Sequence, residues 1–146
     1  MKRLLATHAP AATMLVRLMV GAVFLSEGVQ KFLFPAEVGA GRFAKIGFAS
    51  PEFTAGFVGC FEIACGTLVL LGLFTRWAAA PLIVIMLTAI TTTKVPILLE
   101  SGFWKMAHEA RTDWSMLLGA LFLLIVGAGP WSLDARIAPN DRPRGC

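Results

Sequence analysis

Four long apolar stretches dominate this sequence of 146 residues, and they lie at 11–34, 53–74, 77–99 and 114–129. A helix that crosses the hydrocarbon core of a bilayer needs about 20 mainly apolar residues. The second stretch and the front of the third meet this requirement, whereas the first carries charges and the fourth is short. Tilting or local thinning of the bilayer accommodates a short span. The sequence therefore predicts an all-α, integral membrane four-helix bundle, with residues 1–146 forming one transmembrane domain.

The composition supports a membrane location and argues against a soluble domain. Hydrophobic residues make up 57% of the chain and charged residues only 15%, with a mean hydropathy of +0.74, whereas an ordinary soluble domain has about 25% charged residues. The net charge of +4 would suit nucleic acid, but the basic residues are scattered and flank the apolar stretches. We therefore expect the lipid bilayer, and not nucleic acid, as the partner. The first stretch is expected to be retained, because no A-x-A cleavage pattern follows Phe24.

The basic residues also predict an orientation. With four spans, both termini and the tight turn LFTRWA lie on one side of the membrane. That side carries Lys2, Arg3, Arg76, Arg136, Arg142 and Arg144, and the other side carries Arg42, Lys45, Lys105 and Arg111. By the positive-inside rule we expect a multi-pass protein of the bacterial cytoplasmic (inner) membrane with both termini cytoplasmic. The segment 96–112 should then lie on the outer surface, with Trp104 at the level of the lipid headgroups.

Charged residues inside the predicted spans indicate a site. A helical rise of about 1.5 Å per residue places five of them, from all four spans, in the outer half of the bilayer: Glu27, Lys31, Glu62, Lys94 and Asp113. A charge at the bilayer centre costs about 2.5 to 3.5 kcal/mol on insertion scales, so this grouping predicts a polar ligand-binding site. His108 in the following loop is added as a proton-transfer candidate, although an exposed loop position is its simpler interpretation.

Three other charges are assigned structural roles: Arg17, Arg76 and Asp134. Arg17 lies alone in the inner half, where its long side chain can reach the cytoplasmic lipid phosphates. A structural alternative also applies to the outer charges. In that case Glu27 pairs with Lys31, and Glu62 pairs with Arg17 or Lys94, only to fix the packing of the helices.

Glycines predict that the first two spans approach closely. Gly21 and Gly28 share a face with Lys31, and the second span presents Gly56, Gly59 and Gly66 beside Glu62. Small residues at such positions let two membrane helices pack backbone to backbone. We therefore expect Glu62 to reach Lys31.

The cysteines and histidines do not suggest a metal or an intrinsic redox cofactor. Cys60 and Cys65 are five residues apart and do not form a C-x-x-C pair, so small apolar packing roles are favoured. His8 and His108 lie in a tail and a loop, a placement that does not suit a haem or metal site between helices. Any redox chemistry would therefore depend on a partner protein or a bound quinone.

Three segments resemble the DoxX family of small four-helix bacterial membrane proteins: RLMVGAVFLSEGVQKF, GCFEIACGTLVLLGLFTRWAA and LLGALFLLIVGAGPWSLD. Some members of that family are membrane subunits of thiosulfate:quinone oxidoreductases. Others are linked to quinone stress or to membrane complexes with superoxide dismutase and a thiol-handling partner. Many relatives have His where this chain has Glu27, so imidazole chemistry at that position does not transfer.

Three functional hypotheses follow. The preferred one is a membrane subunit of a redox or stress-response system that binds a quinone-like or small sulfur ligand at the outer polar cluster. It implies a redox partner protein, is compatible with a homo-oligomer, and leaves open whether the chain has catalytic activity. The alternatives are a small transporter or permease, which intramembrane charges would also suit, and a structural scaffold that recruits partner proteins to the membrane.

Overall fold

The structure, a computed structural model, describes residues 10–137. The terminal residues 1–9 and 138–146 lie outside it, and with them Lys2, Arg3, His8, Arg142 and Arg144. Every regular element between residues 10 and 137 is a helix, as the sequence predicts. In chain order these are α2 (Thr13–Leu33), α3 (Ala40–Ile46), α4 (Pro51–Leu71), α5 (Thr75–Ala89), the π-helix η1 (Ile90–Lys94), α6 (Val95–Ser101), α7 (Phe103–Glu109), α8 (Arg111–Val126) and α9 (Leu133–Ile137).

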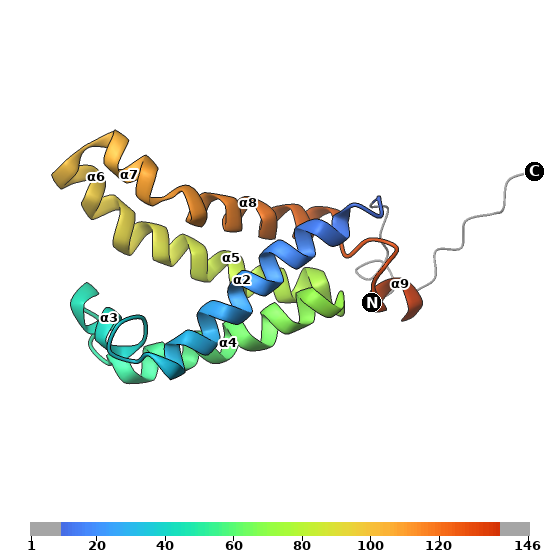
Figure 1. Ribbon diagram of the computed structural model, residues 1–146, viewed down its shortest axis with the longest axis horizontal. Coiled ribbons are helices and arrows are strands. Elements are labelled where there is room, and N and C mark those ends of the chain that lie inside the picture. The colour runs from blue at the N-terminus through green and yellow to red at the C-terminus, as the bar shows by residue number, and fades with distance from the viewer. Residues whose placement is uncertain (1–9, 138–146) are drawn as a thin grey trace, which may run out of the picture.

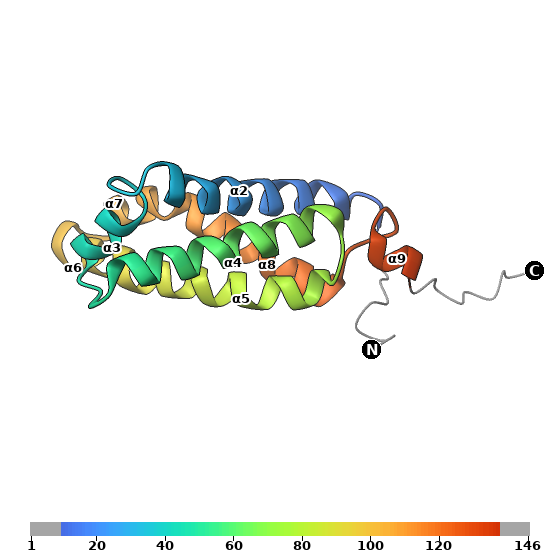
Figure 2. The same cartoon turned by 90° about the horizontal axis from the view of Figure 1, so that it is seen from below.

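The long helices lie side by side, with short helices at both ends. Figures 1 and 2 show α3, α6 and α7 at one end, and α9 at the other end beside the start of α2. Among residues 10–137, three helical segments are long and apolar enough to cross a membrane: Thr13–Leu33, Pro51–Leu71 and Thr75–Ser101. Helix α8 has only 16 residues and begins and ends earlier than the predicted span 114–129.

The third long segment continues through Pro96, although a proline inside a helix usually kinks or ends it. α5, η1 and α6 follow one another without a break, and Pro96 is in the first turn of α6. A proline is tolerated there because first-turn N–H groups need no partner within their own helix. In the π-helical turn the N–H of Val95 donates to the carbonyl of Ile90, five residues earlier. The wider turn thus joins two α-helices, and the helix continues to Ser101.

Helices α2 and α4 are in direct backbone contact at two glycine pairs. A Cβ atom added to Gly21 would lie 2.9 Å from the carbonyl oxygen of Gly66, and one added to Gly28 would lie 2.8 Å from that of Gly59. Both positions therefore require glycine if the two helices are to stay this close. Gly56 differs from the expectation, because nothing lies within 4 Å of a Cβ built there. It is three residues before Gly59, which turns it about 60° away from the contact face.

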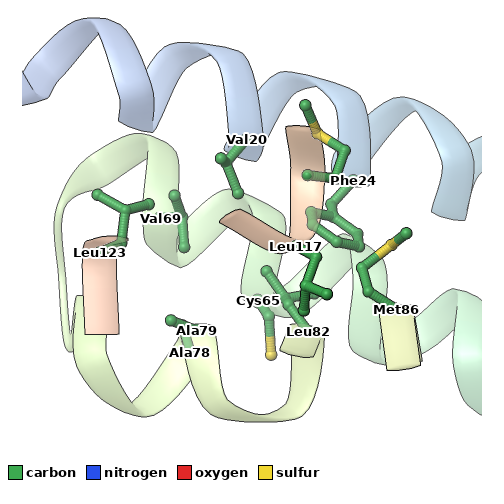
Figure 3. Close-up of a cluster of buried hydrophobic side chains, with 11 residues drawn as sticks. Val20, Phe24, Cys65, Val69, Ala78, Ala79, Leu82, Met86, Leu117 and Leu123 are labelled. Carbon is green, nitrogen blue, oxygen red and sulfur yellow. The ribbon is translucent and has the colours of Figure 1, made fainter. Parts of the chain in front are cut away.

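A core of buried apolar side chains lies between the long helices. Figure 3 shows Val20 and Phe24 of α2 packed against Val69 of α4, Leu82 of α5 and Leu117 of α8. Val20, Val69 and Leu82 are fully buried. The apolar core thus joins α2, α4, α5 and α8.

Arg17 holds the end of the molecule where α9 lies. Its guanidinium donates to four backbone carbonyls, those of Val69, Leu70, Ala128 and Trp131, at 2.6 to 3.1 Å. The expected extension toward lipid phosphates is therefore wrong, because the guanidinium is bound inside the protein by carbonyls near the end of α4 and after α8.

Asp134 links the same end to the start of α5. Its carboxylate accepts hydrogen bonds from the N–H groups of Phe74 (2.7 Å) and Thr75 (3.0 Å). These donors at a helix N-terminus have no partner within the helix, and a carboxylate there also interacts favourably with the helix dipole. Arg76 donates to the carbonyl of Ile125 at 3.0 Å. All three side chains, those of Arg17, Arg76 and Asp134, therefore make contacts at helix ends.

Candidate ligand-binding site

A cavity of about 560 Å³ lies between the pair α2 and α4 and the pair α5 and α8. In Figure 1 these two pairs diverge toward the end that carries α3, α6 and α7. Most of its wall is apolar and includes aromatic rings from three helices and the segment that follows α3: Phe24, Phe43, Phe48 and Phe57. Its charged lining residues are Glu27, Lys31, Arg42, Glu62, Lys94 and Asp113.

On one side of the cavity, Lys31 joins α2 to α4. Its ammonium lies 2.6 Å from Oε2 of Glu62 in α4 and 4.0 Å from Oε2 of Glu27, one turn earlier in α2. The side chains of Lys31 and Glu62 are only 10% and 6% exposed, whereas that of Glu27 is 44% exposed. Lys31 and Glu62 therefore form a close buried pair, with Glu27 at its edge.

Lys94 and Asp113 form a second pair on the other side. The ammonium of Lys94, the last residue of η1, lies 3.3 Å from Oδ2 of Asp113 in the first turn of α8. Lys94 is 9% exposed. A single-turn π-helix often occurs at a functional site. Here the π-helix ends at Lys94, which lines the cavity.

Threonines complete the polar wall beside Lys94. The hydroxyls of Thr88, Thr92 and Thr93 donate to the carbonyls of Val84, Thr88 and Ala89 at 2.6 to 2.9 Å, and all three residues line the cavity. Because each hydroxyl hydrogen is used within the helix, the oxygens offer acceptor lone pairs to the cavity.

The structure brings together five of the six residues proposed for ligand binding. Glu27, Lys31, Glu62, Lys94 and Asp113 line one cavity, whereas His108 is an exposed residue of α7 that does not line it. The alternative partners considered for Glu62 are not used: Arg17 binds carbonyls and Lys94 binds Asp113.

Sequence reasoning missed Arg42 and the threonines as part of the site. Arg42 lies in α3, a short helix that packs against α4 and adds Arg42 and Phe43 to the lining. No local sequence pattern predicts that the segment containing α3 folds back against α4. The run TTTK before Pro96 was a usable signal, because consecutive threonines in an apolar helix bond back to carbonyls and perturb it.

These features define a small helical membrane protein with a partly polar cavity among its helices, and comparison with known proteins gives its family. The chain belongs to the DoxX family, whose model matches residues 12–95. It is also 53% identical over 142 residues to the uncharacterized membrane protein Rv3486 of Mycobacterium tuberculosis, an alignment that covers 93% of this chain and 87% of the relative. No solved structure matches the chain.

Proposed function

We propose that this protein is a membrane subunit of a redox or stress-response system and binds a quinone-like or small sulfur ligand in the cavity. The observation that carries the proposal is the combination of apolar walls with two buried lysine–carboxylate pairs in one cavity. Ligand pockets are typically about 300 to 1,000 Å³, mainly apolar, with a few polar groups that orient the ligand. The volume of about 560 Å³ is within that range.

The chemistry of the charged lining also supports a redox ligand. Reduction of a quinone consumes protons, and ionisable side chains next to a ligand are suited to relay them. Glu62 and Asp113 both line the cavity and each contacts a lysine. Electrons would be exchanged with a redox partner protein, and the chain itself would bind and orient the ligand.

The packing beneath the cavity favours a ligand-binding subunit over a transporter. Phe24, Met86 and Met116 line the cavity and also belong to the apolar core. Further along, the backbones of Gly21 and Gly66 are in contact. A pathway through the bundle would have to break this packing, so a pocket open toward one end is the better interpretation.

The placement in the membrane is part of the proposal. The chain would form a single domain, a four-helix bundle of α2, α4, the segment from α5 to α6, and α8, in the bacterial cytoplasmic membrane. The termini would be cytoplasmic, which would put the cavity in the outer half.

Calorimetric titration of the protein in nanodiscs tests the ligand. We expect saturable binding of decylubiquinone, menadione or thiosulfate at about one molecule per chain, and loss of binding in Val58→Trp, which fills the cavity from α4. Ala64→Trp is the matched control, because Ala64 is exposed on the same helix and does not line the cavity.

Two results would contradict the proposal. One is that none of the three compounds binds, and the other is that Val58→Trp binds them as well as Ala64→Trp does. Flux of thiosulfate into proteoliposomes above that of empty vesicles would favour the transporter instead.

A further inference from the structure

Two lysines reach the cavity from different helix pairs. Lys31 belongs to α2 and contacts Glu62 of α4, whereas Lys94 belongs to η1 and contacts Asp113 of α8. The two pairs of helices diverge around the cavity (Figure 1). Each of the two helix pairs therefore contributes one lysine to the lining of the cavity.

Both ammonium groups have hydrogen-bond donors to spare. A lysine ammonium has three N–H donors. Across residues 10–137, Lys94 has one carboxylate partner, at 3.3 Å, although the residue is 9% exposed. Lys31 has a short contact with Glu62, but its 4.0 Å distance to Glu27 is too long for a hydrogen bond. Because buried donors without acceptors are costly, each lysine is suited to bind an acceptor atom in the cavity.

The charges that line the cavity are balanced. The three carboxylates are Glu27, Glu62 and Asp113, and the three cationic side chains are Lys31, Arg42 and Lys94. An anionic ligand would add an uncompensated charge to this set, at a cost that is large in apolar surroundings. A neutral ligand with acceptor oxygens keeps the balance and still uses the free N–H donors.

We infer that the ligand is a neutral molecule with an apolar body and acceptor oxygens at two ends, one bound by Lys31 and the other by Lys94. A conjugated dicarbonyl ring such as a 1,4-quinone has this pattern. This inference rests on the proposed function and narrows it, because it selects the quinone-like ligand over a sulfur anion and makes Lys94 a determinant of specificity.

The test compares two ligands that differ in one acceptor, 1,4-naphthoquinone and α-tetralone, which has the same bicyclic skeleton and a single carbonyl. Calorimetry in nanodiscs should show that Lys94→Met weakens binding of naphthoquinone by about tenfold or more, as expected for a hydrogen bond from a charged donor. Binding of α-tetralone should change by less than about twofold, because its one carbonyl can still accept from Lys31.

Two further variants make the result interpretable. Lys94→Met leaves the carboxylate of Asp113 without its partner, so the double variant Lys94→Met/Asp113→Asn removes the stranded charge and should show the same ligand selectivity. Lys45→Met is the control, because Lys45 is exposed on α3 and does not line the cavity. It should bind both ligands as the unmodified protein does.

The outcomes separate this inference from the proposed function. Two-point binding is wrong, while quinone binding stands, if naphthoquinone binds to the unmodified protein and the Lys94 variants lose affinity for both ligands equally. The same conclusion follows if the Lys94 variants lose affinity for neither ligand. Thiosulfate binding tighter than naphthoquinone would overturn the choice of a neutral ligand. If the unmodified protein binds neither naphthoquinone nor decylubiquinone, the inference fails together with the quinone-like ligand of the proposed function.

Discussion

Lys31 is the residue at which the charges of two helices meet. Its ammonium lies 2.6 Å from a carboxylate oxygen of Glu62, and both side chains are nearly buried. The net stability gained from such a pair is often small, because both ions lose their hydration when they are buried. Removal of one partner has a much larger effect, because the remaining charge stays buried without compensation.

We expect Lys31→Met and Glu62→Gln to have non-additive effects on stability. Lys31→Met should lower the free energy of unfolding by about 3 to 5 kcal/mol, since it leaves the Glu62 carboxylate unpaired. The double variant should lose less than the sum of the two single losses, because neither charge remains. Thermal unfolding of the three variants in one detergent measures the coupling.

Lys45→Met provides the reference for removing an exposed positive charge, and its effect should be within about 0.5 kcal/mol. Simple addition of the Lys31 and Glu62 losses would mean that the two groups are not in contact.

At the scale of the helices, the contact between α2 and α4 positions this pair. Gly28 lies one turn before Lys31, and Gly59 lies one turn before Glu62. The close backbone contact of the two glycines brings the two charged side chains within reach of each other. The geometry of the site therefore depends on two positions that carry no side chain.

Gly28→Ala should separate the two helices. The added Cβ would lie 2.8 Å from the carbonyl oxygen of Gly59 and 2.9 Å from the backbone nitrogen of Ile63, neither of which can move independently of α4. Overpacking of this kind typically costs about 1 to 3 kcal/mol. We expect a lower melting temperature and weaker binding of cavity ligands.

Gly56→Ala is the matched substitution on α4, where the new methyl group meets no atom within 4 Å. Its stability should be unchanged or slightly higher, because alanine is favoured over glycine inside a helix by about 0.5 to 1 kcal/mol. Equal destabilisation by both changes would argue against the backbone contact.

The elements also show why some features follow from the sequence and others do not. Helical rise alone places Lys94 and Asp113 at one level, and the glycine spacing alone predicts the contact of α2 with α4, because both depend only on regular helix geometry. The internal hydrogen bonds of Arg17 depend on carbonyls up to 114 residues away in the chain. The position of Arg42 depends on how a loop folds back. Neither is determined by a local pattern, so neither could be predicted.

For the whole molecule, the number of membrane crossings depends on α8. Its 16 residues span about 24 Å at a helical rise of about 1.5 Å per residue, compared with a hydrocarbon core of about 30 Å. Yet α8 packs along α5 and contributes Leu117 and Leu123 to the core shared with the longer helices. In the proposed four-helix arrangement α8 would lie at the same depth as its neighbours, and local thinning of the bilayer would compensate for the missing length.

We therefore expect α3 and α9 to be on opposite sides of the membrane. In a variant with Cys60, Cys65 and Cys146 replaced by alanine, a single cysteine is introduced at Ala44 in α3 or at Arg136 in α9, both of which are exposed. A membrane-impermeant maleimide should label Ala44→Cys in intact spheroplasts, and should label Arg136→Cys only after permeabilisation. The reverse pattern would invert the orientation predicted from the basic residues. Labelling of both from outside would mean that α8 does not cross the membrane, because an odd number of spans would then separate the start of α2 from α9.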